Sequence, residues 1–311
     1  MNEEGDKMET QKNLNTYLIH QRRYFHMHPE IGFDTYQTAS YIYNELKNLG
    51  YSPCYLLNKA AVVAKLNLGK EKTIAFRSDM DALPIQELNT IAYKSTNSYM
   101  HACGHDAHMA ILLTLAKAIR EHLNEINYNI TFIFQPAEEI SEGASDVLAT
   151  GLLEDVQGII GFHNIPQLKA GQLALNAGAM MAGVEKFKVT VTGVSSHAAR
   201  PDLGVDTVTA ITTMVQNLQL LISRTVSPFE TAVLSITHLD VGSTWNVLPK
   251  SGYFEGTIRS FNPSVQRDLK AHFISIIRHI AESLEVDVAF EWGVTPPVTF
   301  NDEELTKVVW E

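Results

Sequence analysis

The hydrophobic and polar positions in the first half of the chain follow a helical pattern and a strand pattern in turn. Apolar residues recur at helical spacing in three segments, residues 13–28, 34–50 and 108–123. Asp34 is placed to cap the second of these helices, and Gly50 to end it. Short β-branched or aromatic runs predict four strands, at residues 60–68, 72–77, 129–134 and 156–162. Such alternation predicts an α/β domain whose sheet is largely covered on both faces.

The pattern changes after residue 182. From there the runs predict, in order, a strand, a helix, two strands, a helix and a strand, at residues 185–194, 205–223, 231–241, 251–261, 263–284 and 285–293. This is the βαββαβ order of a ferredoxin-like domain. We therefore predict a first α/β domain at residues 1–182 and a ferredoxin-like domain at residues 183–293. Residues 294–311 are predicted to start a segment that returns to the first domain.

Charge and cysteine content narrow the classes of function. The 311 residues carry a formal net charge of −11 and no dense run of Lys or Arg, which argues against nucleic acid or an anionic membrane as a partner. Cys54 and Cys103 are too few for a disulfide framework. The first ten residues are polar and acidic, unlike a signal peptide, and no apolar run is long enough to span a bilayer. These features predict a globular, cytoplasmic protein that acts on small molecules.

Polar side chains cluster where three of the predicted strands end. Acidic or histidine residues follow the strands that end at residues 77, 134 and 162, namely Asp79, Asp81, Glu138, Glu139 and His163. The stretch HACGHDAH, at residues 101–108, lies just before a helix and adds Cys103 and His105. Because ligands of open α/β sheets bind at the carboxyl ends of the strands, we expect the four segments to converge on one edge of the sheet.

These residue types suit metal chemistry. One residue separates Cys103 from His105, so a thiolate and an imidazole can point at one ion, and neighbouring loops could complete a two-metal site. The pair could instead be a buried structural cysteine beside a capping histidine, and we expect His108 to pack or hydrogen-bond. Glu138 and Glu139 would repel each other unless a cation lies beside them. One could then bind the ion while the other acts as general base; the alternative is a solvated loop pair.

Three residues at the same edge could have a structural role instead of a role in metal binding. His163 could be a neutral imidazole ligand or a structural histidine at the end of a strand. Asp79 and Asp81 share a side of the chain if the segment stays extended, so they could bind metal or orient a histidine. They could equally be turn carboxylates that accept backbone N–H groups.

The second domain adds three candidates. His197 lies in a Gly/Ser-rich loop, from which it could reach over a site in the first domain. Asn246 offers an amide donor, and Arg259 offers a bidentate clamp for a carboxylate. Each of the three could also be an ordinary loop or strand residue.

Six motifs occur in order along almost the whole chain: FHMHPEIGFDTYQTASYI, FRSDMDALPIQE, MHACGHDAHMAILL, FIFQPAEE, GFHN and SSHAARPDLGVD. Together they resemble the metal-dependent amidohydrolase family of aminoacylases, hippurate hydrolases, bacterial N-acyl-amino-acid deacetylases and plant indoleacetyl-amino-acid hydrolases. The resemblance implies an α/β fold in which a catalytic phosphorylase/hydrolase-like domain is interrupted by a ferredoxin-like lid and dimerisation domain. It also implies a homodimer.

The resemblance implies roles for the candidate residues. Two divalent ions, Mn²⁺, Zn²⁺ or Co²⁺, would be held by Cys103, His105, Glu139 and His163, with Glu138 as general base. The other matching positions would stabilise the tetrahedral intermediate or contact the substrate carboxylate, namely His197, Asn246 and Arg259. His197 often acts across the dimer in the family. Asp79 and Asp81 stand where relatives have a His-x-Asp motif, so we expect them to support the site.

The implied reaction is hydrolysis of the amide bond of N-acyl amino acids, for example N-acetyl amino acids. The family also takes a last histidine ligand from a segment after the position of Glu311, whereas all twelve histidines here lie at or before His279. Two alternatives follow. The chain could be a catalytically impaired member that acts as a binding or dimerisation module, or a metallocarboxypeptidase that acts on short peptides.

Overall fold

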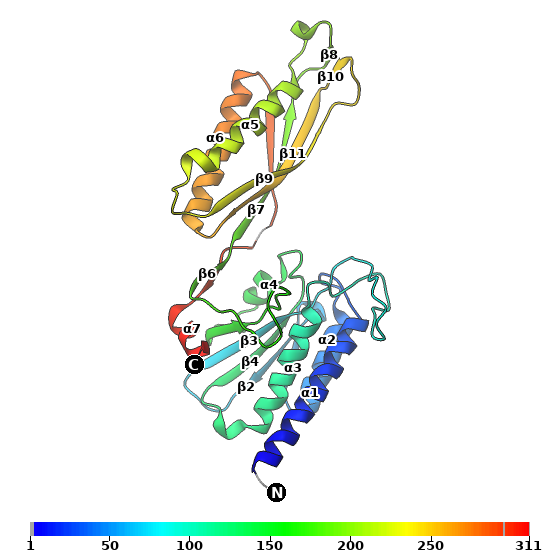
Figure 1. Cartoon of the computed structure of the whole chain (residues 1–311), viewed down its shortest axis with the longest axis vertical. Helices are drawn as coiled ribbons and strands as arrows, with labels where there is room; N and C mark the ends of the chain where they lie inside the picture. The colour runs from blue at the N-terminus through cyan, green and yellow to red at the C-terminus, as the bar shows by residue number, and fades with distance from the viewer. Residues whose placement is uncertain (1–2, 295, 311) are drawn as a thin grey trace. The chain divides into compact units, whose positions relative to one another are not determined.

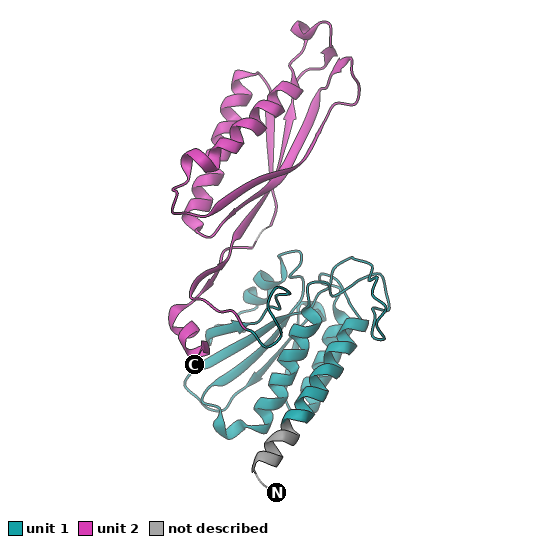
Figure 2. Ribbon diagram, viewed as in Figure 1, with its two compact units in different colours: residues 1–172 teal, residues 173–311 magenta. Residues whose placement is uncertain are grey.

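The computed structural model describes residues 3–294 and 296–310, with side chains from residue 11 onward. It consists of two compact units, residues 1–172 and residues 173–311, which Figure 2 shows in teal and magenta. Each unit has a hydrophobic core of its own, so the two fold around separate interiors.

Unit 1 is a layered α/β structure (Figure 1). Its helices are α1 (Glu3–Met27), α2 (Tyr36–Asn48), α3 (His105–Glu121) and α4 (Gly143–Ala149), with 3-10 turns at Leu57–Lys59 and Leu123–Glu125. Its strands are β1 (Pro53–Leu56), β2 (Ala61–Leu66), β3 (Thr73–Asp79), β4 (Asn129–Gln135) and β5 (Val156–Gly161). They form one mixed sheet in the order β1-β2-β4-β3-β5. β3 is parallel to β4 and β5, while β2 is antiparallel to β4 and β1.

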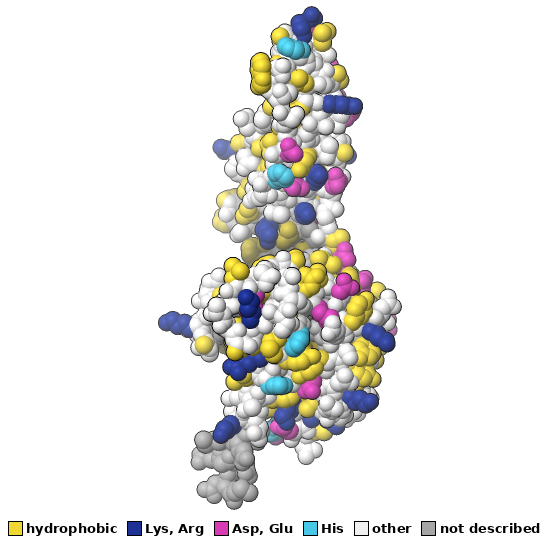
Figure 3. Space-filling view, turned by 90° about the vertical axis from the view of Figure 1, so that its right-hand side faces the viewer, with side chains coloured by type: hydrophobic (Ala, Val, Ile, Leu, Met, Phe, Trp, Pro, Cys, Tyr) yellow, Lys and Arg dark blue, Asp and Glu magenta, His cyan; other side chains and the backbone are white. Residues whose placement is uncertain are grey.

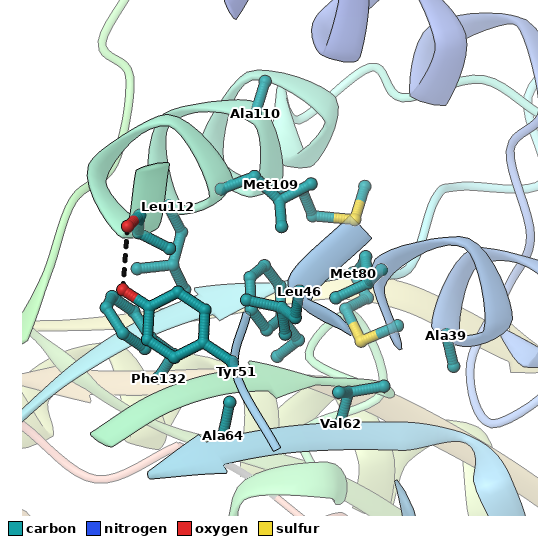
Figure 4. Close-up of a cluster of buried hydrophobic side chains, with 14 of the residues drawn as sticks. Ala39, Leu46, Tyr51, Val62, Ala64, Met80, Met109, Ala110, Leu112 and Phe132 are labelled. Carbon is teal, nitrogen blue, oxygen red and sulfur yellow. Dashed lines mark hydrogen bonds between the residues drawn. The ribbon is translucent and has the colours of Figure 1, made fainter. Parts of the chain in front are cut away.

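Alternation along the strands sends side chains to the two faces of this sheet. Val62 of β2 joins a large core with helices α1, α2 and α3, whereas its neighbour Val63 joins a smaller cluster that includes α4. Figure 4 shows part of the large core, where the Tyr51 hydroxyl donates a 2.8 Å hydrogen bond to the backbone carbonyl of Ala116 on α3. β5 alternates between half-buried and exposed residues, so at this edge strand one face of the sheet is open.

The start of α2 also differs from the prediction. Asp34 is not the cap: Thr35 is the N-cap residue, and its hydroxyl binds a backbone carbonyl next to β2 instead of the helix. The carboxylate of Glu30 accepts the first free N–H groups of the helix, those of Gln37 and Thr38, at 3.2 and 2.7 Å. A negative charge suits this end of a helix. The prediction is wrong because the turn after α1 folds a more distant carboxylate back onto the helix.

Unit 2 contains the predicted ferredoxin-like fold. Its main elements are β7 (Gly183–Thr192), α5 (Thr207–Thr225), β9 (Ala232–Val241), β11 (Ser251–Ser260), α6 (Pro263–Ser283) and β12 (Asp287–Trp292). The four strands form an antiparallel sheet in the order β12-β7-β11-β9. Helices α5 and α6 pack with its buried side chains into one core. The βαββαβ expectation and the α/β fold class are therefore confirmed.

Shorter elements flank this body. They are β6 (Gly178–Met181), β8 (Ser196–His197), a 3-10 turn at Pro201–Leu203, β10 (Val247–Leu248), β13 (Thr299–Asn301) and α7 (Glu303–Trp310). β8 pairs with β10, and β6 pairs with β13, so the chain entering the ferredoxin-like body and the chain leaving it run side by side. The boundary between the two compact units lies between residues 172 and 173. The domain boundary proposed at residue 182 and the return segment proposed at residues 294–311 remain predictions.

The exterior carries a mixture of charges. On the face shown in Figure 3, Lys and Arg side chains are scattered among Asp and Glu. Within residues 3–294 and 296–310, no helix is both long and apolar enough to cross a membrane.

Candidate metal centre

The carboxyl ends of three parallel strands lie at one edge of the unit 1 sheet. β3 runs parallel to both β4 and β5, so their last residues, Asp79, Gln135 and Gly161, lie on the same side. The loops that leave these strands carry the acidic and histidine residues selected from the sequence. Helix α3 begins beside them at His105.

His105 is fully buried at the centre of this group. Its Nδ1 donates to the backbone carbonyl of Asp81 at 2.7 Å, so a neutral ring keeps its lone pair on Nε2. Nε2 has no hydrogen-bond partner in the described part of the chain, and carboxylate oxygens of Asp79, Glu138 and Glu139 lie 3.7, 3.8 and 3.8 Å away. A lone pair surrounded by carboxylates is repulsive, and a cation between them would remove the repulsion.

Asp81 holds the loop that carries the adjacent glutamates. Its two carboxylate oxygens accept the backbone N–H groups of Glu138 and Glu139, each at 3.0 Å. The Glu139 side chain is only 19% exposed and its Oε1 has no partner among the described residues, whereas 42% of the Glu138 side chain is exposed. Burial raises the pKa of Glu139, and the charges of Glu138 and Asp81 add to the rise. An ionised Glu139 is therefore favoured only where a positive charge lies beside it, whereas Glu138 remains open to solvent.

The turn at residues 30–32 connects two of the site's loops. Ala82 donates its N–H to the carbonyl of Glu30 at 2.7 Å, and Ala137 donates to the carbonyl of Gly32 at 3.0 Å. Ala137 has a φ of +56°, which is strained for a residue with a Cβ. These bonds hold the strained turn after β4 that directs the two glutamates.

Cys103 and His163 face each other at the same site. The Cys103 Sγ lies 3.4 Å from His163 Nε2, and His163 Nδ1 donates to the carbonyl of Asn164 at 2.8 Å. Burial raises the pKa of Cys103 to about 12, and the nearby Glu139 and Glu138 carboxylates contribute. Because metal ligation requires the thiolate, Cys103 can act as a ligand only where a cation offsets these effects.

Asp79 and His108 are bonded to each other. His108 Nδ1 donates to one oxygen of Asp79 at 2.7 Å, and its Nε2 lies 2.6 Å from Asn164 Oδ1 and 3.0 Å from the Asn164 backbone nitrogen. Arg77 binds the other Asp79 oxygen at 2.8 Å. Burial alone would raise the pKa of Asp79, but the hydrogen bond from His108 and the charge of Arg77 hold it below its usual range. Asp79 and His108 are thus satisfied without an ion.

The donor set fits divalent metal ions. Among the described residues, three groups of side chains have possible ligand atoms within 4.8 Å of one another: Cys103, His105 and His163; His105, Glu138 and Glu139; and Asp79, His105 and His108. The first two groups contain all four proposed ligands and the proposed base. Nitrogen, sulfur and carboxylate donors of this kind suit Zn²⁺ or Co²⁺, and the carboxylates also suit Mn²⁺.

Unit 2 brings two of its three candidates together. His197 of β8 pairs with Val247 of β10, and the Ala198 N–H donates to the carbonyl of Asn246 at 3.0 Å. Arg259 lies eight residues along β11 from the end next to β10, which is about 26 Å at the usual rise of a strand. Arg259 therefore lies toward the end of β11 that is remote from the β8–β10 pair.

Several residues that support the site are not among the candidates predicted from the sequence. Asn164 binds His108, and Gly104 approaches it so closely that a Cβ at position 104 would lie 2.3 Å from Asn164 Oδ1. Gly104 also has a φ of +95°, which favours glycine. Arg77, on β3, binds Asp79. The one available signal was the position of Gly104 and Asn164 next to Cys103 and His163 in the chain.

Comparisons with known proteins show which family model matches the chain and which proteins it is similar to. A family model described as peptidase family M20/M25/M40 matches residues 75–311. An N-acetyl-L-cysteine deacetylase of Bacillus subtilis (strain 168) is 36% identical over 298 residues, which cover 95% of this chain and 72% of that protein. An N-acyl-L-amino acid amidohydrolase of Geobacillus stearothermophilus is 35% identical over 295 residues, covering 93% and 80%.

A solved structure is also similar to this chain in fold and in sequence. A Bacillus subtilis protein described as a dinuclear metal-binding peptidase of the M20 family superposes with a TM-score of 0.82 at 32% identity. The match covers 95% of this chain and 78% of the other.

Proposed function

This chain belongs to peptidase family M20/M25/M40, and on that premise we propose that it hydrolyses the amide bond of N-acyl amino acids with two divalent metal ions. One observation carries the proposal: the buried Nε2 of His105 has no partner among the described residues and is surrounded by carboxylates, with Glu139 Oε1 equally unpartnered. The relatives' names support the substrate class, and the dinuclear centre described for the solved relative supports two ions.

The proposed ligands are Cys103, His105, Glu139 and His163. His105 and Glu139 offer the two unpartnered atoms, and Cys103 and His163 present sulfur and nitrogen from the facing loops. Ions bound there would polarise the scissile carbonyl and lower the pKa of a water molecule. Mn²⁺, Zn²⁺ and Co²⁺ all suit this donor set.

Glu138 is proposed as the general base. It lies beside the same His105 nitrogen, at 3.8 Å, but keeps 42% of its side chain exposed, so it can meet both water and substrate. Its carboxylate takes a proton from the attacking water as the new C–O bond forms. It then returns that proton to the nitrogen as the C–N bond breaks. The products are a carboxylic acid and a free amino acid.

The unit 2 residues are proposed to act on the same substrate in a homodimer. His197 would stabilise the oxyanion, and Asn246 and Arg259 would bind the substrate carboxylate. The position of Arg259 toward the end of β11 that is remote from the β8–β10 pair supports contributions from two subunits at each site. Both cysteines are free, which fits the proposed cytoplasmic location.

The replacement of Glu138 by Gln tests the base. Glu138→Gln is expected to keep the metal content of the wild type but lower turnover of N-acetyl amino acids by about 10²- to 10⁴-fold, because a positioned base contributes that much. Metal content is measured by elemental analysis after dialysis against Mn²⁺ or Zn²⁺, and turnover by release of free amine.

Glu142→Gln is the matched control, because Glu142 is exposed and lies in the same loop. Normal turnover of Glu138→Gln would exclude this base. A wild-type chain that retains no metal would contradict the metal centre itself. Release of amino acids from short peptides, but not from acylated amino acids, would favour the carboxypeptidase alternative.

A further inference from the structure

A buried charge network connects α1 to the start of α3 and to the loop at residues 87–95. His26 of α1 lies between two carboxylates: its Nδ1 is 2.8 Å from Asp106 Oδ2, and its Nε2 is 3.1 Å from Glu87 Oε1. Arg22, one turn earlier on α1, places its Nε 2.9 Å from the same Asp106 oxygen. The side chains of His26, Glu87 and Asp106 are 4%, 0% and 1% exposed, whereas that of Arg22 is 38% exposed.

The geometry favours a doubly protonated His26. Each of its ring nitrogens faces a carboxylate oxygen, and an ionised carboxylate only accepts hydrogen bonds. A neutral ring would turn a lone pair toward one of the two. With both nitrogens protonated, His26 and Arg22 supply two positive charges against the negative charges of Glu87 and Asp106, and the buried group is neutral.

The surrounding groups agree with this assignment. The hydrogen bond to Asp106 raises the pKa of His26 against the opposing effect of burial. Tyr93 meets the His26 ring edge-on at 5.7 Å. His101, which precedes α3, is buried, and neither of its ring nitrogens has a partner among the described residues.

The network ends next to the proposed ligands. Asp106 directly follows His105 at the start of α3. Glu87 accepts the N–H of Ser95 at 2.7 Å and the amide of Asn89 at 3.0 Å, so it folds the loop that leads toward Cys103. One imidazolium therefore joins the two ends of the segment that carries both ligands.

We propose that His26 is a positioning residue, whose doubly protonated ring holds the start of α3 and the 87–95 loop so that Cys103 and His105 point at the ions. The proposal rests on the proposed metal centre. It requires the positive charge of His26, and a neutral side chain of similar size would not suffice.

A first experiment examines the metal-free wild-type chain and needs no substitution. Long-range proton–nitrogen NMR of histidine-labelled protein near neutral pH is expected to show protons on both ring nitrogens of His26. A neutral ring overturns the proposal.

A second experiment separates charge from shape. His26→Gln removes the charge but keeps one amide donor. It is expected to weaken Mn²⁺ binding by about 10- to 100-fold, the usual effect of losing a partner that orients metal ligands. Adding Glu87→Gln restores neutrality: the amide nitrogen introduced at position 87 can donate to the amide oxygen introduced at position 26, and its amide oxygen still accepts from Ser95. The exposed Asn89 side chain, which donates to the Glu87 oxygen that faces His26, then has to turn its own oxygen toward the new nitrogen. The double variant is expected to recover most of the affinity, and His20→Gln, on the exposed face of α1, to match the wild type.

The same variants are compared without metal by hydrogen exchange at the amides of residues 103–108. Exchange is expected to be faster in His26→Gln and to slow again in the double variant. Unchanged affinity and exchange in the single variant would overturn the proposal, as would a double variant no better than the single one, since packing alone predicts additive losses. If the wild type binds no metal, the proposed function fails, while the exchange and NMR results still decide the role of His26.

Discussion

Two buried histidines near the start of α3 have pKa values shifted in opposite directions because their neighbours differ. His26 lies between the carboxylates of Glu87 and Asp106, and its pKa is raised. Neither ring nitrogen of His101 has a partner in the described part of the chain, and burial lowers its pKa to about 4. A histidine in water titrates near 6.5, so the surroundings shift the two residues in opposite directions.

This difference predicts how the stability of the metal-free chain depends on pH. The folded pKa of His101, about 4, lies below the unfolded value of about 6.5, so the unfolded state binds more protons between these values. Stability is therefore lost as the pH falls from about 6.5 to about 4, by up to about 3 kcal/mol from this residue. His101→Leu removes a titrating group that makes no hydrogen bond to a described residue, and it is expected to flatten this slope.

Urea unfolding at several pH values, with a chelator present, measures the effect. His20→Leu, at an exposed position of α1, is the control and should keep the wild-type slope. An equal acid slope in His101→Leu and the wild type would contradict the assignment.

At the scale of single elements, the start of α2 shows how a local sequence pattern can predict the wrong residue as the helix cap. Asp34 stands where a helix cap is expected, yet the carboxylate of Glu30 accepts the N–H groups of Gln37 and Thr38. The backbone carbonyl of Glu30 also accepts the N–H of Ala82, in the loop that follows β3. The turn that caps α2 is thus the turn that supports the site.

Two substitutions distinguish these caps. Glu30→Ala is expected to lower the free energy of unfolding by about 0.5–2 kcal/mol, the usual cost of losing a cap. Asp34→Ala, at an exposed position, is expected to change it by less than about 0.5 kcal/mol. Denaturant unfolding of both variants gives the two values. A larger loss in Asp34→Ala than in Glu30→Ala would contradict the structure of this turn.

At the scale of the whole molecule, the distance between candidates in unit 2 bears on assembly. His197 and Asn246 lie together at the β8–β10 end, and Arg259 lies about 26 Å from the start of β11. The chain also folds around two separate cores, one for each unit. This placement is the basis for the proposal that a second copy of unit 2 completes the site.

Mixing two inactive variants tests this arrangement. Glu138→Gln and His197→Ala are each expected to lose turnover, and light scattering should give twice the chain mass of 34.6 kDa. If His197 acts across the dimer, mixed dimers contain one intact site. Unfolding and refolding the two variants together should then recover about a quarter of the wild-type activity. Mixtures that stay as inactive as either variant alone would place His197 in its own subunit's site.

The sequence alone determined most of the elements and the location of the site. Periods of two and of three to four residues reflect burial on one side of a strand or helix, so the long helices and the βαββαβ order could be predicted locally. The segments of Asp79, Glu138 and His163 follow three strands, and parallel strands bring such segments to one edge. Short β1, α4 and the β6–β13 pair lack a long enough periodic pattern and were not predicted.

Only the tertiary structure decided which groups satisfy one another. Asp79 and His108 bind each other, whereas His105 Nε2 and Glu139 Oε1 keep no partner among the described residues. The His26 network likewise joins residues up to 80 positions apart. Hydrogen bonds and charges act over a few ångströms in space, and burial strengthens them, so their partners depend on the packing of distant segments. The sequence determines the chemical type of each side chain, but the charge of that side chain and its availability to bind a metal ion depend on the fold.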